Sequence, residues 1–213
     1  MRVGPVIDLM GLTVAGPDHF YASGHPGPGV ELPEPVGLIE SLDGGVTWAP
    51  LSRQGQSDFH ALTSSDAGVV GFDGAATSIT TDGTTWRELD PPVAPYALTA
   101  SSDGAILLAT SESGLIRSIE AGDTWTAVDR APLLQVVDWS ERQTAVGVTP
   151  DGTVAVSDDN GNSWSERGRV NGPPQAVAAL RTAQGQLRVL VVTDDGVWES
   201  TDGARPFGSL DTP

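Results

Sequence analysis

The feature that most constrains the fold of this 213-residue chain is an eight-residue motif that recurs along its length. Three copies, at 41–48, 118–125 and 157–164, fit the pattern Ser-x-Asp/Glu-x-Gly-x-Thr/Ser-Trp. A shorter copy ends at Trp86, and a divergent copy ends at Phe207. The closing aromatic residues lie 38 to 43 positions apart, a period typical of repeat architectures.

The motif resembles the Asp-box, or bacterial neuraminidase repeat, and the resemblance covers almost the whole chain. In that family each box is the turn between the third and fourth strands of a propeller blade. The residue types agree, since aspartate accepts turn N–H groups, glycine tolerates positive φ, and an aromatic ring is buried between sheets. We therefore predict turn scaffolding, in preference to calcium binding or catalysis, for Asp43, Trp48, Asp82, Trp86, Glu120, Trp125, Asp159, Trp164, Asp202 and Phe207.

The segments between the boxes read as short strands separated by turns. The clearest unit has four expected strands, at 134–140, 144–149, 153–158 and 164–169. No segment has helical periodicity with caps. We predict an all-β fold: a β-propeller of four-stranded antiparallel blades in a single domain, 1–213. Five blades are traced, at approximately 6–54, 58–90, 95–130, 133–170 and 175–213.

The alternative is a six-bladed relative that lacks its first blade. Such an incomplete propeller would expose sheet edges, and oligomerisation would be one way to cover them.

Composition and charge narrow the functional classes. The chain has 28 acidic and 11 basic residues, a net charge of −17 and no cysteine. No cysteine means no disulfide framework and no thiolate site, and the charge repels phosphate backbones, so no nucleic acid partner is expected. We predict no transmembrane segment and no signal peptide in this chain. Proteins with such boxes are mainly secreted or surface-attached, and the resemblance implies a secreted or cell-surface location.

A second repeated register points to a candidate site at the starts of the innermost strands. The segment 8–13 aligns with 58–63, the same register continues at 96–99, and it becomes weaker at Gln135 and Val177. Residues two apart share a face of a strand, which pairs Asp8 with Met10 and Asp58 with His60. The segment 24–35 contains His25, four prolines and three glycines. We expect this loop to arch over the same mouth of the channel.

Three interpretations of this mouth stay open. His25, His60 and Met10 could ligate a transition metal, the one cofactor that the sequence suggests. Asp8, Asp58, Tyr96 and Gln135 could instead bind a small polar or carbohydrate ligand. In the third interpretation the histidines are packing residues and Met10 fills the channel. His19, in a turn, is expected to be solvated.

Phrases such as VIDLMGLTVAGPDHF and GLIESLDGGVTW resemble a bacterial propeller family labelled glycosyl hydrolase or exo-sialidase. Sialidases clamp a substrate carboxylate with arginine forks and use a tyrosine nucleophile. Here Arg53, Arg87, Arg130 and Arg167 follow the boxes on expected outer strands, and none begins an inner strand. The favoured hypothesis is therefore a non-catalytic propeller that binds a ligand, metal or protein partner under loop 24–35. The alternative is a glycoside hydrolase using carboxylates at the same mouth, with no catalytic residue assigned.

Overall fold

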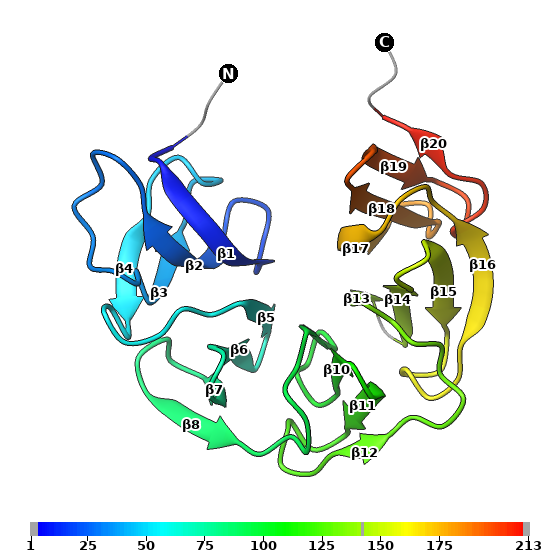
Figure 1. The fold of residues 1–213 in the computed structure, drawn as a ribbon, viewed down its shortest axis with the longest axis horizontal. Helices are drawn as coiled ribbons and strands as arrows, with labels where there is room; N and C mark the ends of the chain where they lie inside the picture. The colour runs from blue at the N-terminus through cyan, green and yellow to red at the C-terminus, as the bar shows by residue number, and fades with distance from the viewer. Residues whose placement is uncertain (1–3, 142, 211–213) are drawn as a thin grey trace. The chain divides into compact units, whose positions relative to one another are not determined.

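Regular structure in the computed structural model of the protein is entirely β-strand within the described residues, 4–141 and 143–210. Twenty strands form five four-stranded sheets, and each sheet is an antiparallel meander with its strands in chain order (Figure 1). The predicted all-β class with four-stranded antiparallel propeller blades is therefore confirmed. None of the described residues forms a helix that could cross a membrane.

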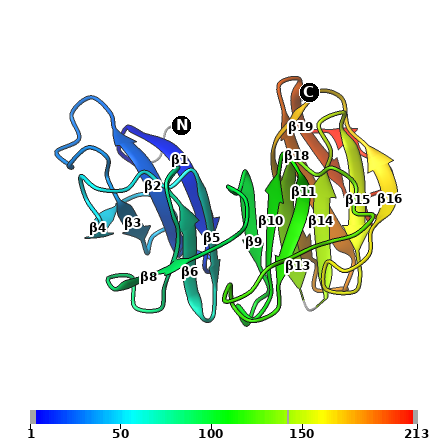
Figure 2. The ribbon, with the colours of Figure 1, turned by 60° about the horizontal axis from the view of Figure 1, so that its bottom comes forward.

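The first compact unit runs to Pro95 and holds two blades. Blade 1 consists of β1 (Ile7–Val14), β2 (Phe20–Pro26), β3 (Leu38–Ser41) and β4 (Ala49–Ser52). Blade 2 consists of β5 (Ala61–Ser65), β6 (Gly68–Phe72), β7 (Thr77–Thr80) and β8 (Trp86–Leu89). The innermost strands β1 and β5 lie side by side (Figure 2).

The second compact unit begins at Tyr96 and holds three blades. Blade 3 consists of β9 (Ala97–Ala100), β10 (Leu107–Ser111), β11 (Gly114–Ser118) and β12 (Thr126–Ala127). Blade 4 consists of β13 (Val136–Glu141), β14 (Thr144–Val148), β15 (Thr153–Ser157) and β16 (Ser165–Arg169). Blade 5 consists of β17 (Pro174–Arg181), β18 (Leu187–Thr193), β19 (Gly196–Ser200) and β20 (Gly208–Ser209). The first strand of blade 4 contacts the first strands of blades 3 and 5.

Apolar side chains between neighbouring blades form the cores. Leu38 of blade 1 meets Phe59, Leu62 and Val69 of the next blade, and Trp86 packs against them. Trp164 packs in the cluster between blades 3 and 4, and Phe207 in the cluster between blades 4 and 5. The aromatic residue of each of these boxes is therefore inserted toward the preceding blade, which links the repeat motif to blade packing.

The hydrogen bonds of the box turns are local. In the first box Asp43 accepts the N–H of Thr47 at 2.8 Å, and Ser41 Oγ accepts the N–H of Gly45 at 2.8 Å. Trp48 Nε1 donates to the carbonyl of Gly45 at 3.2 Å. The hydrogen bond from Thr47 N–H, the main cause, lowers the pKa of Asp43. These bonds tie the carboxylate to its own turn.

Candidate functional site

The candidate site lies in the first unit, where the segment before β5 meets the end of β2. Phe59 is fully buried, its ring stacks on Trp86 with centroids 4.8 Å apart, and its N–H donates to Ser23 Oγ at 2.9 Å. A Cβ on Gly71 would lie 2.5 Å from the Phe59 ring, so glycine is needed beneath it. Phe59 therefore acts as an anchor that holds the backbone of its two neighbours, Asp58 and His60, in place.

Glycine also lets blade 1 approach the anchor. A Cβ on Gly11 would lie 2.4 Å from the carbonyl oxygen of Phe59, so no larger residue fits at this crossing. Gly24 has φ +149°, and a Cβ there would meet the carbonyl oxygen of Asp8 at 2.0 Å. The next residue, His25, pairs across the sheet with Asp8. The two glycines thus allow the end of β2 to reach the start of blade 2.

His25, Asp58 and His60 come together around a single carboxylate oxygen. His25 Nε2 and His60 Nε2 each lie 3.0 Å from Asp58 Oδ2. The two imidazole nitrogens are therefore separated by no more than twice that distance. The contact between His25 Nε2 and Asp58 Oδ2 is a hydrogen bond. On the other side of the ring, Nδ1 of His25 faces Glu34 Oε1 at 3.6 Å.

Two polar atoms of this cluster are shielded from solvent without a hydrogen-bond partner: His25 Nδ1 and Asp58 Oδ1. The rings themselves reach the surface, since the side chains of His25 and His60 are 39% and 50% exposed. An unpaired polar atom hidden from water costs about 1–3 kcal/mol. A ligand that supplied a donor would recover part of this cost, and this makes the three residues, with Asp8, the candidate site.

The loop that follows β2 is tied down at both ends. The N–H of Gly27 donates to the carbonyl of Val6 at 2.8 Å, and that of Val36 donates to the carbonyl of Gly24 at 2.9 Å. Farther along, Gly55 N–H donates to Pro35 O at 2.8 Å. The loop thus carries Glu34 to the Nδ1 side of His25 on a fixed frame.

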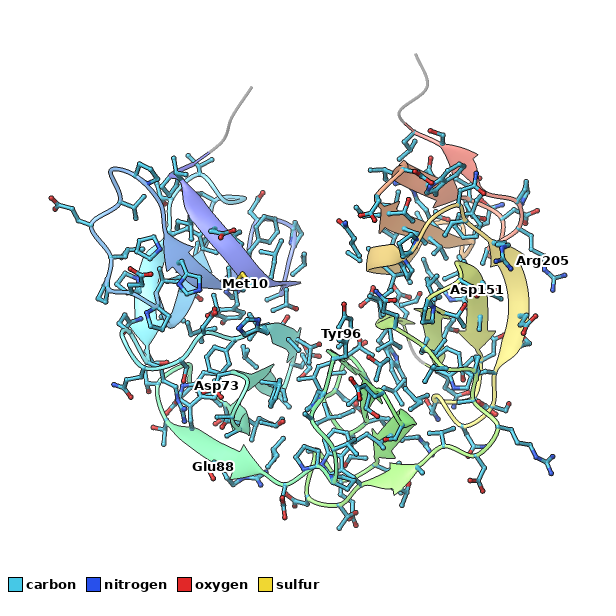
Figure 3. The ribbon with its side chains drawn as sticks, in the orientation of Figure 1. Met10, Asp73, Glu88, Tyr96, Asp151 and Arg205 are labelled. Atoms are coloured by element: carbon cyan, nitrogen blue, oxygen red, sulfur yellow. The ribbon has the colours of Figure 1, made fainter. Side chains whose placement is uncertain are left out.

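The other residues singled out in the sequence lie elsewhere or differ from expectation. Met10 (labelled in Figure 3) stands at a register irregularity between Leu9 and Gly11, which interrupts the alternation that paired it with Asp8. No group of three or more histidine, aspartate or glutamate residues in the described ranges is arranged to hold a metal ion.

Tyr96 and Gln135 belong to the second unit. Tyr96, labelled in Figure 3, precedes β9. It is 62% exposed. Gln135 donates from Nε2 to the carbonyl of Pro174 at 2.7 Å, and its own carbonyl accepts Thr110 Oγ1 at 2.9 Å. These bonds connect three successive blades, so the contacts of Gln135 are structural.

The expectation for His19 is wrong. Its Nε2 lies 2.7 Å from Glu40 Oε1, and its ring contacts Tyr21 with centroids 4.7 Å apart. The turn before β2 places His19 next to β3, where the Glu40 carboxylate binds its imidazole ring. Desolvation, together with Glu40, raises the pKa of Tyr21.

Sequence reasoning missed a carboxylate on the innermost strand of blade 4. Asp138 Oδ2 accepts the N–H of Ala179 on β17 at 2.7 Å. Desolvation raises the pKa of Asp138 to about 6, against the lowering effect of its hydrogen bonds to Ala179, Trp139 and Thr99. A lone aspartate in the apolar run of β13 is the signal that could have found it. Its hydrogen-bond partners are two main-chain N–H groups and a threonine side chain, so we assign Asp138 to the packing of blades 4 and 5.

Comparisons with known proteins describe the fold. No protein-family model and no curated protein matches the chain. Among solved structures it resembles a chain of the nidogen/laminin complex at a TM-score of 0.67 and 14% identity, covering 96% of this chain and 79% of the other. It resembles YCF48 bound to D1 peptide at a TM-score of 0.56 and 15% identity, covering 98% and 82%.

The chain also resembles the GH74 enzyme of Niastella koreensis, at a TM-score of 0.62 and 15% identity. All of this chain is covered but it spans about a third of that enzyme, 32%. At such identities these likenesses establish the β-propeller fold, which hosts both binding proteins and glycoside hydrolases.

Proposed function

We propose that this protein is a non-catalytic propeller that binds a basic segment of a protein partner at the cluster of Asp8, His25, Asp58 and His60. The observation that carries the proposal is the convergence of the partly exposed rings of His25 and His60 on the carboxylate of Asp58, whose Oδ1 has no hydrogen-bond partner. A carboxylate oxygen accepts hydrogen bonds, so the complementary group is a donor such as a lysine ammonium or an arginine guanidinium.

Charge supports the same choice. Asp8 pairs with His25 across the sheet, Glu34 Oε1 lies 3.6 Å from His25 Nδ1, and the whole chain carries a net charge of −17. A field of this sign attracts cationic segments and speeds their encounter. YCF48 with its D1 peptide and nidogen with laminin are propeller-fold examples of protein recognition. A secreted or cell-surface location, which the box resemblance implies, fits such a role.

The test is fluorescence anisotropy with a labelled octalysine peptide, with octaglutamate as the peptide control. Asp58→Asn and His25→Gln should each weaken octalysine binding at least fivefold. Asp66→Asn is the matched control, because Asp66 is exposed in the β5–β6 turn of the same unit and its loss removes the same charge. Equal weakening by Asp58→Asn and Asp66→Asn would mean that net charge alone attracts the peptide, and the proposed site would be wrong.

The second candidate function is glycoside hydrolysis at the same place. Asp8 pairs with His25 across the sheet and Asp58 binds the same histidine, so two carboxyl groups lie near one residue, and such chemistry uses a pair of carboxyl groups. The test is release of nitrophenol from a panel of aryl glycosides. Turnover that is lost in both Asp8→Asn and Asp58→Asn but kept in Asp66→Asn would favour the hydrolase, and no turnover on any glycoside would count against it.

A further inference from the structure

We propose a second binding site, for the carboxylate or phosphate group of a small acidic ligand, at Arg117 and Arg130 on the outer side of blade 3. The two arginines line a cleft of about 400 Å³ together with Asn162 of the next box turn and Asp129. This cleft lies within the second unit and shares no residue with the histidine cluster.

Arg117 stands at a position of the repeat that is apolar in two of the other four blades. It directly precedes the box serine on the third strand of its blade. In blades 2 and 4 the same position holds Ile79 and Val156, and both are buried. Arg117 pairs across the sheet with Leu108, which packs in the core between blades 3 and 4. Its Nε is shielded from solvent and has no hydrogen-bond partner.

Charged residues at the same position of other blades are satisfied by the protein itself. In blade 1 this residue is Glu40, which binds His19 at 2.7 Å. In blade 5 it is Glu199, which binds Arg188. Arg117 is partly exposed, but its Nε is shielded and no acidic side chain among the described residues pairs with it, an arrangement that costs free energy unless a ligand does so.

Arg130 lies five residues after the box tryptophan, a position that holds an arginine in two other blades as well. Those two arginines have partners within the protein, as Glu40 and Glu199 do. Arg53 at that position lies over the Trp86 ring at 5.1 Å and donates to Ser57 at 3.3 Å. Arg169 at that position binds Asp151 at 3.0 Å. No hydrogen bond or ion pair links the Arg130 side chain to any residue that the structure describes.

The chemistry of the cleft selects an oxyanion. Two guanidinium groups and the Asn162 amide supply N–H donors, and guanidinium forks match the geometry of carboxylate and phosphate oxygens. Asp129 is the one acidic residue that lines the cleft. Its charge opposes an anion, so it should limit the affinity.

The experiment titrates the protein at constant ionic strength with inorganic phosphate and, separately, with succinate. Binding is followed by calorimetry and by the ¹H–¹⁵N resonance of the Arg117 Nε–H group. We expect saturable binding in the millimolar range or tighter for at least one anion, and the preferred anion tells phosphate from carboxylate recognition. Chloride at the same ionic strength should give no saturable shift.

The variants separate the site from general charge effects. Arg130 is exposed and has φ +62°, a conformation that suits glycine, so Arg130→Gly should fold normally and weaken binding at least tenfold. Arg117→Met should do the same, whereas Asp129→Asn should tighten binding severalfold. The matched control is Arg53→Gly, which removes the same charge at the same repeat position and at a similar φ of +60°, and it should leave binding unchanged. No saturable shift with either anion, or undiminished binding in Arg130→Gly, would overturn the proposal.

Discussion

The carboxylate of Asp138, on the first strand of blade 4, accepts the main-chain N–H of Ala179, on the first strand of blade 5, at 2.7 Å. Desolvation raises the pKa of Asp138 to about 6, above the ordinary aspartate value near 3.9. Between these two values the native state therefore holds a proton that the unfolded chain has lost. The contribution of Asp138 to the free energy of unfolding is largest below about pH 4 and declines as the pH rises through 6.

The Asp138→Asn variant should remove this dependence. An amide oxygen at this position can still accept the Ala179 N–H, but it does not ionise. Relative to the native protein, the variant should gain about 2 to 3 kcal/mol of stability between pH 4 and pH 7. Urea unfolding at a series of pH values measures this difference. A difference that stays constant with pH would show that Asp138 titrates normally in the folded protein.

Phe59 should be the most sensitive apolar residue under the histidine cluster. Its ring is fully buried between Trp86 and the bare backbone of Gly71. Phe59→Ala leaves a cavity there and should lower the free energy of unfolding by about 3 to 5 kcal/mol. Tyr96→Ala, which removes an exposed ring, is the control and should cost less than about 0.5 kcal/mol. A small loss for Phe59→Ala in urea unfolding would contradict the anchoring role.

Two box turns should respond in opposite directions to exchange of glycine and alanine. Ala121 has φ +52°, so Ala121→Gly relieves strain and should stabilise the protein by about 0.5 to 1 kcal/mol after the entropy of glycine is deducted. Gly161 has φ +76°, and a Cβ added there would lie 2.7 Å from Leu108 Cδ2. Gly161→Ala should therefore destabilise the protein. Thermal unfolding of the two variants checks both signs, and a shared sign would contradict the turn geometry.

The fold could be predicted from the repeat motif, because each box lies at a turn between the third and fourth strands of a blade. The aromatic residues of three boxes pack in cores between neighbouring blades. The site was partly accessible, since the aligned starts of β1 and β5 singled out Asp8, Asp58 and His60. The register irregularity at Met10 could not be predicted from the sequence, because a register shift leaves the pattern of residue types unchanged. The His19–Glu40 contact depends on strand pairing between residues distant in sequence, which local patterns do not report.

The hydroxyl of Ser52 should couple the two blades of the first unit through Trp86. Ser52 Oγ donates to the carbonyl of Gly83 at 2.6 Å and accepts Trp86 Nε1 at 3.0 Å. Ser52→Ala leaves the indole N–H without this acceptor and should cost about 1 to 2 kcal/mol. Trp86→Phe removes the same donor, so the double variant should lose less stability than the two single losses added together. Urea unfolding of all four proteins gives the coupling energy, and strictly additive losses would show that this hydrogen bond contributes nothing to the joint between the blades.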